Sequence, residues 1–178
     1  SYASVWCNGQ YVGGWPYGYA SFRLDLTPYI KPGQKNVLAI RLDNPDDTSR
    51  WYPGSGIYRN VWLVKTSPVH VEQWGTFVRN RQVDSESAVM EMGVNIENHA
   101  GKDVQVKLQT SVYLQGKDGR PIGEEVTQST TKDIAIKKDS WSSARFQFKV
   151  DKPKLWDIDT PNCYVAVSRI FMDGKEMD

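Results

Sequence analysis

A strict alternation of apolar and polar side chains between residues 104 and 115 limits the fold of this chain more than any other feature. The apolar positions are Val104, Val106, Leu108, Val112 and Leu114. Successive side chains of a β-strand point to opposite faces, so these residues share one face of a strand. No helix-period pattern occurs anywhere in residues 69–178. The sequence therefore predicts an all-β fold.

Three further segments of the second half support this prediction. Residues 90–96 and 146–150 alternate in the same way, with Met, Val, Ile and Phe on one face. Residues 164–172 are apolar on both faces, as expected for a central strand, and Asp173-Gly174 then begins a hairpin turn. We expect residues 67–178 to form an immunoglobulin-like β-sandwich.

The first part of the chain is predicted to consist of short strands and turns. Asn8-Gly9 suits the type I′ turn of a hairpin that joins strands 5–7 and 10–12. Further strands are expected at 21–26 and 36–42. Thr27 is expected to cap a short helical turn. A boundary at Thr66-Ser67-Pro68 separates the two predicted domains.

The stretch from 49 to 63, SRWYPGSGIYRNVWL, combines aromatic, arginine and glycine residues. We expect it to begin as a loop and to end in a strand at 61–64, buried on both faces, with Trp62 in the core. Arg59 is expected to be buried and to bridge the turn's carbonyls or a carboxylate such as Asp43. The residue types fit a structural corner or a sugar-facing loop, and their spacing does not choose between them.

The same stretch, with NGQYVG, FRLDLTPYIKPGQKNVLAIRLDN and KLWDIDTPNCY, resembles glycoside hydrolase family 2, in particular its β-galactosidase-like members. The resemblance implies that residues 1–66 are the carboxy-terminal part of a jelly-roll sugar-binding domain. Residues 67–178 would be the immunoglobulin-like domain that follows it. Within the KLWDIDTPNCY segment, Trp156 is expected to pack in a corner.

The resemblance also implies what the chain does. In the family, two glutamates of a TIM-barrel domain hydrolyse β-glycosidic bonds with retention, and no residue of this chain matches them. We therefore expect no catalytic residue here, and the rest of the parent glycosidase and a carbohydrate substrate as partners. The 44–56 loop would supply sugar contacts, for which the candidates are Asp47, Arg50 and Trp51. Arg50 stands where the best-known members carry an aspartate.

Composition and spacing exclude several other functions. The chain has 22 Lys and Arg against 21 Asp and Glu, so neither nucleic acid nor an anionic membrane is an expected partner. No apolar run approaches the roughly 20 residues of a membrane-spanning helix. His70 and His99 are far apart in sequence and lack neighbours at ligand spacing, so neither a metal nor a cofactor is expected. Cys7 and Cys163 are expected to be free, buried thiols.

Two alternatives to a glycosidase fragment stay open at this level, namely a separate carbohydrate-binding module and a purely structural pair of sandwiches. A further expectation concerns the end of the sequence. Asp173-Gly174-Lys175-Glu176 is expected to form the hairpin turn, and only Met177 and Asp178 follow it. The last strand of the second sandwich is therefore expected to be missing. Self-association through the exposed edge of strand 164–172 would then follow, giving a homo-oligomer.

Overall fold

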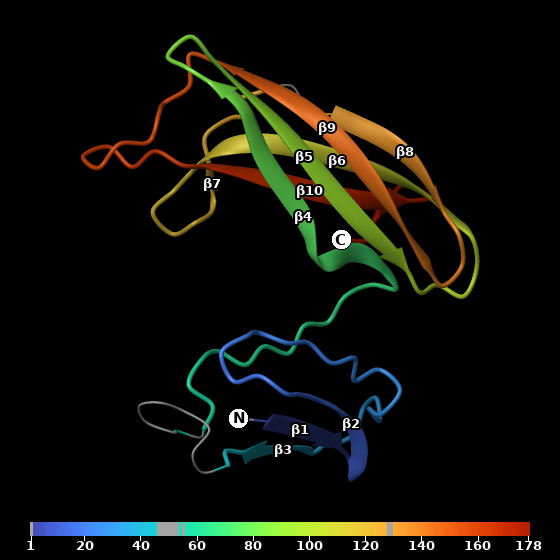
Figure 1. Cartoon of the computed structure of the whole chain (residues 1–178). Helices are drawn as coiled ribbons and strands as arrows, with labels where there is room; N and C mark the ends of the chain where they lie inside the picture. The colour runs from blue at the N-terminus through green and yellow to red at the C-terminus, as the bar shows by residue number, and fades with distance from the viewer. Residues whose placement is uncertain (1, 46–53, 55, 128–129) are drawn as a thin grey trace. The chain divides into compact units, whose positions relative to one another are not determined.

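The computed structural model describes residues 2–45, 54, 56–127 and 130–178. The chain divides into two compact units, Ser1–Leu63 and Val64–Asp178, and each is treated by itself. All regular secondary structure in the described residues is β-strand (Figure 1). The prediction of an all-β fold is confirmed. Since these residues contain no helix at all, they also contain none that could span a membrane.

The first unit is built on one antiparallel sheet in the order β2-β1-β3. Its strands are β1 (Tyr2–Cys7), β2 (Gln10–Trp15) and β3 (Leu38–Asp43). Asn8 and Gly9 both have positive φ angles, of 53° and 81°. These angles are those of the type I′ turn that matches the twist of a hairpin, so the predicted hairpin is confirmed.

The segment between β2 and β3 contains a turn but no strand. The amide of Ile30 donates to the Leu26 carbonyl at 3.1 Å, and Asp25 Oδ1, rather than Thr27, caps the turn by accepting from the Thr27 amide at 2.8 Å. The predicted strand at 21–26 is wrong. Phe22 instead stacks on Trp15, with the ring centroids 6.2 Å apart. A ring contact holds this segment where the sequence suggested a ladder of backbone hydrogen bonds.

The second unit contains two antiparallel sheets. One has the order β4-β5-β9, and the other has the order β11-β10-β6-β7 with β8 also paired to β6. The strands are β4 (Val69–Val83), β5 (Ser87–Asn98), β6 (Val104–Gln115), β7 (Pro121–Ile122), β8 (Thr130–Ile136), β9 (Ser140–Asp151), β10 (Tyr164–Met172) and β11 (Lys175–Glu176). The runs β4-β5-β9 and β11-β10-β6 correspond to the A-B-E and G-F-C sheets of an immunoglobulin-like sandwich.

The two sheets of the second unit enclose one hydrophobic core. Its members come from six strands and alternate with exposed residues, as predicted for β5, β6 and β9. They include Val69, Met92, Val94, Ile96, Val104, Val106, Leu108, Val112, Ile134, Ile136, Ala144, Phe146, Phe148 and Ile170. A period-2 pattern thus places each of these side chains between the sheets.

The end of the sequence runs alongside β10. Phe171 pairs with Glu176 and Met172 with Lys175 across the predicted hairpin turn. The ladder continues beyond it, because Ile170 accepts from the Met177 amide at 2.7 Å and donates to the Asp178 carbonyl at 2.9 Å. Part of the outer edge of β10 is therefore paired. Self-association through the remainder of this edge stays a prediction.

Candidate functional site

The loop that the sequence singles out for sugar contact lies largely outside the described residues. Asp47, Arg50 and Trp51 all fall in the undescribed range 46–53. Their assignment as substrate-binding residues therefore stays a prediction. The description of the chain resumes at Gly54 and is then continuous from residue 56 to residue 127.

The segment that follows this loop is an exposed, irregular apolar run. Residues 57–63 contain no strand, and Trp62 and Leu63 expose 78% and 84% of their surface. The predicted buried strand at 61–64 is wrong, and so is the prediction that Trp62 lies in the core. A strand buried on both faces needs a sheet to join and a layer on each side. The described part of the first unit provides neither for this segment.

Arg59 is exposed as well. Its guanidinium carbon lies 5.6 Å from the centroid of the Tyr58 ring, a cation–π distance, and Tyr58 itself is 65% exposed. Asp43, the carboxylate named as a partner for Arg59, instead lies 3.8 Å from Arg41. The predicted burial of Arg59 is wrong for this chain, because the strand that would have buried it does not form.

The predictions that Trp156 packs in a corner and that Cys163 is buried are also wrong, because both side chains are exposed. The Trp156 side chain is 64% exposed, although its backbone forms a bridge with Pro161. Hydrogen bonds rather than rings hold this corner, since the amide of Lys154 donates to the Tyr164 hydroxyl at 2.7 Å. Cys7 is a free buried thiol as predicted, whereas Cys163 is free but exposed.

Aromatic side chains line a shallow depression of about 240 Å³ in the first unit. Tyr2, Tyr11 and Trp15 contribute to its walls, and each exposes more than a third of its surface. Gly14 permits the close approach of β1, because a Cβ there would lie 2.2 Å from the Ala3 carbonyl oxygen. Exposed aromatic faces of this kind can bind the apolar face of a sugar or pack against another protein surface.

Sequence reasoning missed a cluster of two histidines and a glutamate on the outer face of the β4-β5-β9 sheet. The register of β4 against β5 places His70 opposite Glu97, and His99 follows two residues later. Glu97 Oε2 lies 3.5 Å from His70 Nε2 and 3.3 Å from His99 Nε2. His70 Nδ1 lies 2.9 Å from the Ser67 carbonyl oxygen.

The two histidines are far apart in sequence, but the long β4–β5 pairing brings them together in space. Their ring centroids are 6.0 Å apart. Within the described residues, no three His, Cys, Asp or Glu side chains are arranged to hold a metal ion. The cluster instead ties the start of β4 to the end of β5.

A strained bulge in β4 was also missed. The register shifts between Val71 and Thr76, and Trp74 has a φ of 60° with 66% of its surface exposed. Gly75 must be glycine here, since a Cβ would lie 2.7 Å from the Cβ of Glu72. The Trp-Gly pair inside a strand pattern was the available signal, because an isolated glycine in a strand often marks a bulge.

The acidic groups with shifted pKa values are held as carboxylates. Three acceptor bonds, of which the one from the Ser87 amide has the largest effect, lower the pKa of Asp84. The hydrogen bond from Lys137 lowers the pKa of Asp103. A general acid for glycoside hydrolysis needs the opposite shift, a pKa raised toward neutrality. Neither group is therefore suited to that role.

The chain is similar to known proteins of one family. Residues 69–178 match the family described as Glycosyl hydrolases family 2. The chain is 42% identical over 99% of its length to beta-galactosidase BoGH2A of Bacteroides ovatus, of which it covers 20%. It is 26% identical over its full length to a beta-glucuronidase of Bacteroides fragilis, of which it covers 26%.

A solved structure agrees. A glycosyl hydrolase family 2 member from Bacteroides cellulosilyticus superimposes on 99% of the chain with a TM-score of 0.88 and 32% identity. The chain covers 23% of that protein. It thus spans about a fifth to a quarter of the length of the relatives it matches. With more than half of its residues matched by the family, this chain belongs to glycosyl hydrolases family 2.

Proposed function

We propose that the chain is a non-catalytic portion of a retaining, β-galactosidase-like glycosidase that hydrolyses terminal β-glycosidic bonds. Its near-complete alignment with one fifth of a beta-galactosidase, at 42% identity, is the observation that carries this proposal. The two carboxylates of the retaining mechanism, about 5–5.5 Å apart, would lie in a TIM-barrel domain elsewhere in the parent protein. The chain would act as scaffold, and the 44–56 loop would form one wall of the sugar subsite.

The exposed apolar surface of the first unit supports a role inside a larger protein. Trp62, Leu63 and Tyr19 each expose more than three quarters of their surface, and other aromatic residues of this unit are also exposed. Soluble proteins rarely leave contiguous apolar patches uncovered. A larger parent would cover such a surface with its own residues.

The charged groups of the second unit support a non-catalytic role. Asp103 pairs with Lys137 at 2.8 Å and Asp151 with Lys149 at 2.8 Å, each on an exposed edge or turn. Arg81 pairs with Glu91 on the outer face of the β4-β5-β9 sheet. Of these carboxyl groups, Asp103 has a pKa that its hydrogen bond with Lys137 lowers, the opposite of the shift that a general acid needs.

The proposal is tested by glycosidase assays of the complete protein that contains this chain. We expect it to release aryl aglycones from a β-galactoside faster than from a β-glucuronide, and the 178-residue chain to release none. Proton NMR of the first-formed sugar should show the β-anomer, as retention requires. A complete protein without glycosidase activity, or turnover by the chain that is lost on mutating one of its own carboxylates, would contradict the proposal.

A further inference from the structure

The outer face of the sheet formed by β10, β6 and β8 carries a hollow of about 500 Å³. The side chains that define it are Gln105, Lys107, Gln109, Asp133, Phe171 and Asp173. All of them belong to the second unit, and none belongs to the 44–56 loop. The hollow is within the size range of small-molecule sites, which is about 300–1,000 Å³.

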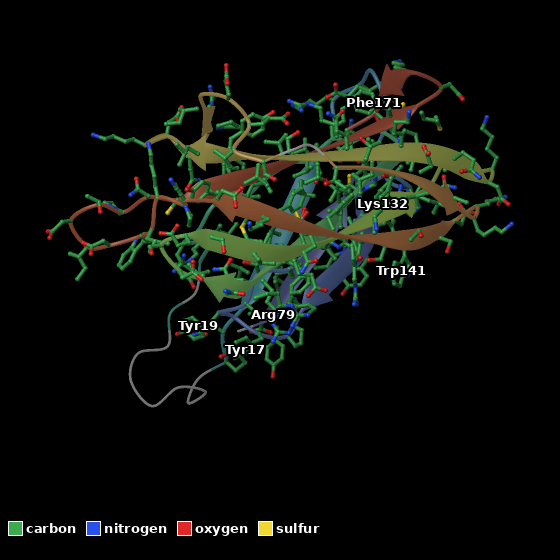
Figure 2. All side chains as sticks on the ribbon, turned by 90° about the horizontal axis from the view of Figure 1, so that it is seen from above. Tyr17, Tyr19, Arg79, Lys132, Trp141 and Phe171 are labelled. Atoms are coloured by element: carbon green, nitrogen blue, oxygen red, sulfur yellow. The ribbon has the colours of Figure 1, made fainter. Side chains whose placement is uncertain are left out.

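Strand register explains how these side chains meet. Lys107 lies opposite Asp133 on β8 and opposite Phe171 on β10, so the three form a row across the sheet. Gln105 and Gln109 flank Lys107 along β6, and the three span about 13 Å, since same-face residues repeat every ~6.6 Å. The hairpin turn at Asp173-Gly174 closes one side. Figure 2 shows Phe171 on the opposite side of the sandwich from Trp141.

The polar groups in this hollow are free to bind a ligand. Lys107 and Asp133 are cross-strand neighbours, yet no ion pair joins them in the part of the chain that the structure describes. Elsewhere on the same unit, comparable neighbours do pair, as Arg81 does with Glu91 and Lys137 with Asp103. The two glutamine amides also have no side-chain partner among the described residues.

The chemistry of the hollow matches a sugar. Phe171 is half-buried and offers an apolar ring, against which the C–H face of a pyranose can pack. Each glutamine amide supplies both a donor and an acceptor for hydroxyl groups. Among the lining side chains, Asp133 and Asp173 bring two negative charges against the single positive charge of Lys107. Arg169, opposite Gln109 on β10, adds no net charge because Glu176 lies 4.0 Å from it. A neutral sugar therefore fits better than a uronic acid, which the excess negative charge would repel.

We infer that this hollow is a glycan-binding surface that binds a neutral β-linked oligosaccharide. The inference rests on the proposed function, because the parent protein would act on β-linked glycans. The surface would hold part of a glycan on which the parent glycosidase acts. Binding is expected to be weak, since the hollow is open to solvent.

The test is an NMR titration of the 178-residue chain, which lacks the family's catalytic glutamates. The probes are cellotetraose and β-1,4-galactotetraose as neutral glycans and trigalacturonate as an acidic one. We expect the side-chain amide signals of Gln105 and Gln109 to shift with a neutral glycan and not with trigalacturonate. Phe171→Leu, which keeps an apolar side chain on β10, and Gln109→Ala should each weaken binding about tenfold. Gln147→Ala, on the outer face of the other sheet, should leave it unchanged.

Each outcome bears on one claim. Absence of shifts with both neutral glycans, equal binding of trigalacturonate, or undiminished binding by Phe171→Leu overturns the inference. Shifts that centre on Trp74 or Trp141 also overturn it, since those residues lie on the other sheet. If the chain binds nothing while the complete protein hydrolyses aryl glycosides, only this inference fails. If the chain binds a neutral glycan and the complete protein is inactive, only the proposed function fails.

Discussion

Both units of this chain are built from antiparallel β-strands, but their interiors are very different. In the second unit two sheets face each other, and Ile96, Leu108 and Ile170 are fully buried between them. In the first unit a three-stranded sheet buries Val5 and Cys7, while Trp15 and Tyr11 expose 41% and 57% of their surface. A single sheet can bury only what another layer covers. The second unit therefore supplies its own core, whereas the described part of the first leaves large aromatic side chains exposed.

Truncating a central core residue of the second unit should have the largest effect. Leu108 pairs with β8 on one side and β10 on the other and has no exposed surface. We expect Leu108→Ala to lower the free energy of unfolding of the second unit by about 3 kcal/mol, since it leaves a cavity. Val5→Ala should cost the first unit about 1.5 kcal/mol. Hydrogen exchange followed by mass spectrometry reports the two units separately, and equal losses would abolish the contrast.

Two asparagines that organise turns provide a second comparison. Asn98 is fully buried, and its Nδ2 donates to the carbonyls of Lys102, Ile136 and Lys137 at 2.8, 3.2 and 3.0 Å. Asn36 forms a similar set of bonds with Asn8, Lys31 and Gln34, but on the surface.

We expect Asn98→Ala to lower the free energy of unfolding by about 2 kcal/mol, because it leaves the buried carbonyl of Ile136 and two partly buried carbonyls without their donor. For Asn36→Ala, water can replace the lost bonds, and the loss should stay below about 1 kcal/mol. Denaturant unfolding measures both. A larger loss for Asn36→Ala would show that the first unit is held together chiefly by its turns.

A smaller effect is expected from the exposed pair of Asp103 and Lys137. The hydrogen bond between them lowers the pKa of Asp103 and raises that of Lys137. The Asp103 contribution to stability is therefore present above its unfolded pKa of about 3.9 and is lost as the pH falls through the lower folded pKa. The Lys137 contribution is present below about pH 10.4 and is lost as the pH rises through the raised folded pKa.

Asp103→Asn should thus flatten the acid limb of the stability profile of the second unit while leaving its core intact. Thermal unfolding of the wild-type chain and the variant between about pH 7 and pH 3 measures this difference. Asp133→Asn is the matched control, because Asp133 forms no ion pair among the described residues. Identical acid limbs for all three proteins would show that the pair contributes nothing measurable.

The sequence predicted well where one face of a strand is covered. Alternation in β5, β6 and β9 identified core residues, and Asn-Gly and Asp-Gly located two hairpins, because both signals act over a few residues. The β8 strand was missed since Lys132 interrupts its alternation. This ammonium points inward, 5.3 Å from the centroid of the buried Phe146 ring (Figure 2). An inward-pointing charge protects an edge strand from pairing with other chains. Here it also replaces an apolar residue of the alternation from which the strand could have been predicted.

The candidate site was less predictable because its parts are brought together by long-range pairing. His70 and Glu97 are joined by the register of β4 and β5, and Lys107, Asp133 and Phe171 by that of three strands. The spacing of residues along the sequence does not show that either group of side chains comes together. At Trp62 the apolar run predicted burial, but the described part of the first unit has no layer to cover this side chain.

The smallest change in the free energy of unfolding is expected for Arg59→Ala, which also tests the difference between the units most directly. The guanidinium is exposed and contacts the ring of Tyr58, itself exposed. In the 178-residue chain, Arg59→Ala should therefore change the free energy of unfolding by less than about 0.5 kcal/mol, as is usual at surface sites. The same substitution in the complete protein should cost more if further residues cover the apolar run beside Arg59, because a buried guanidinium is held by paired hydrogen bonds. Denaturant unfolding of both proteins, with Arg79→Ala on β4 of the second unit as the exposed control, measures the difference. A loss near 3 kcal/mol in the chain alone would mean that the first unit already buries Arg59 and does not depend on a covering layer.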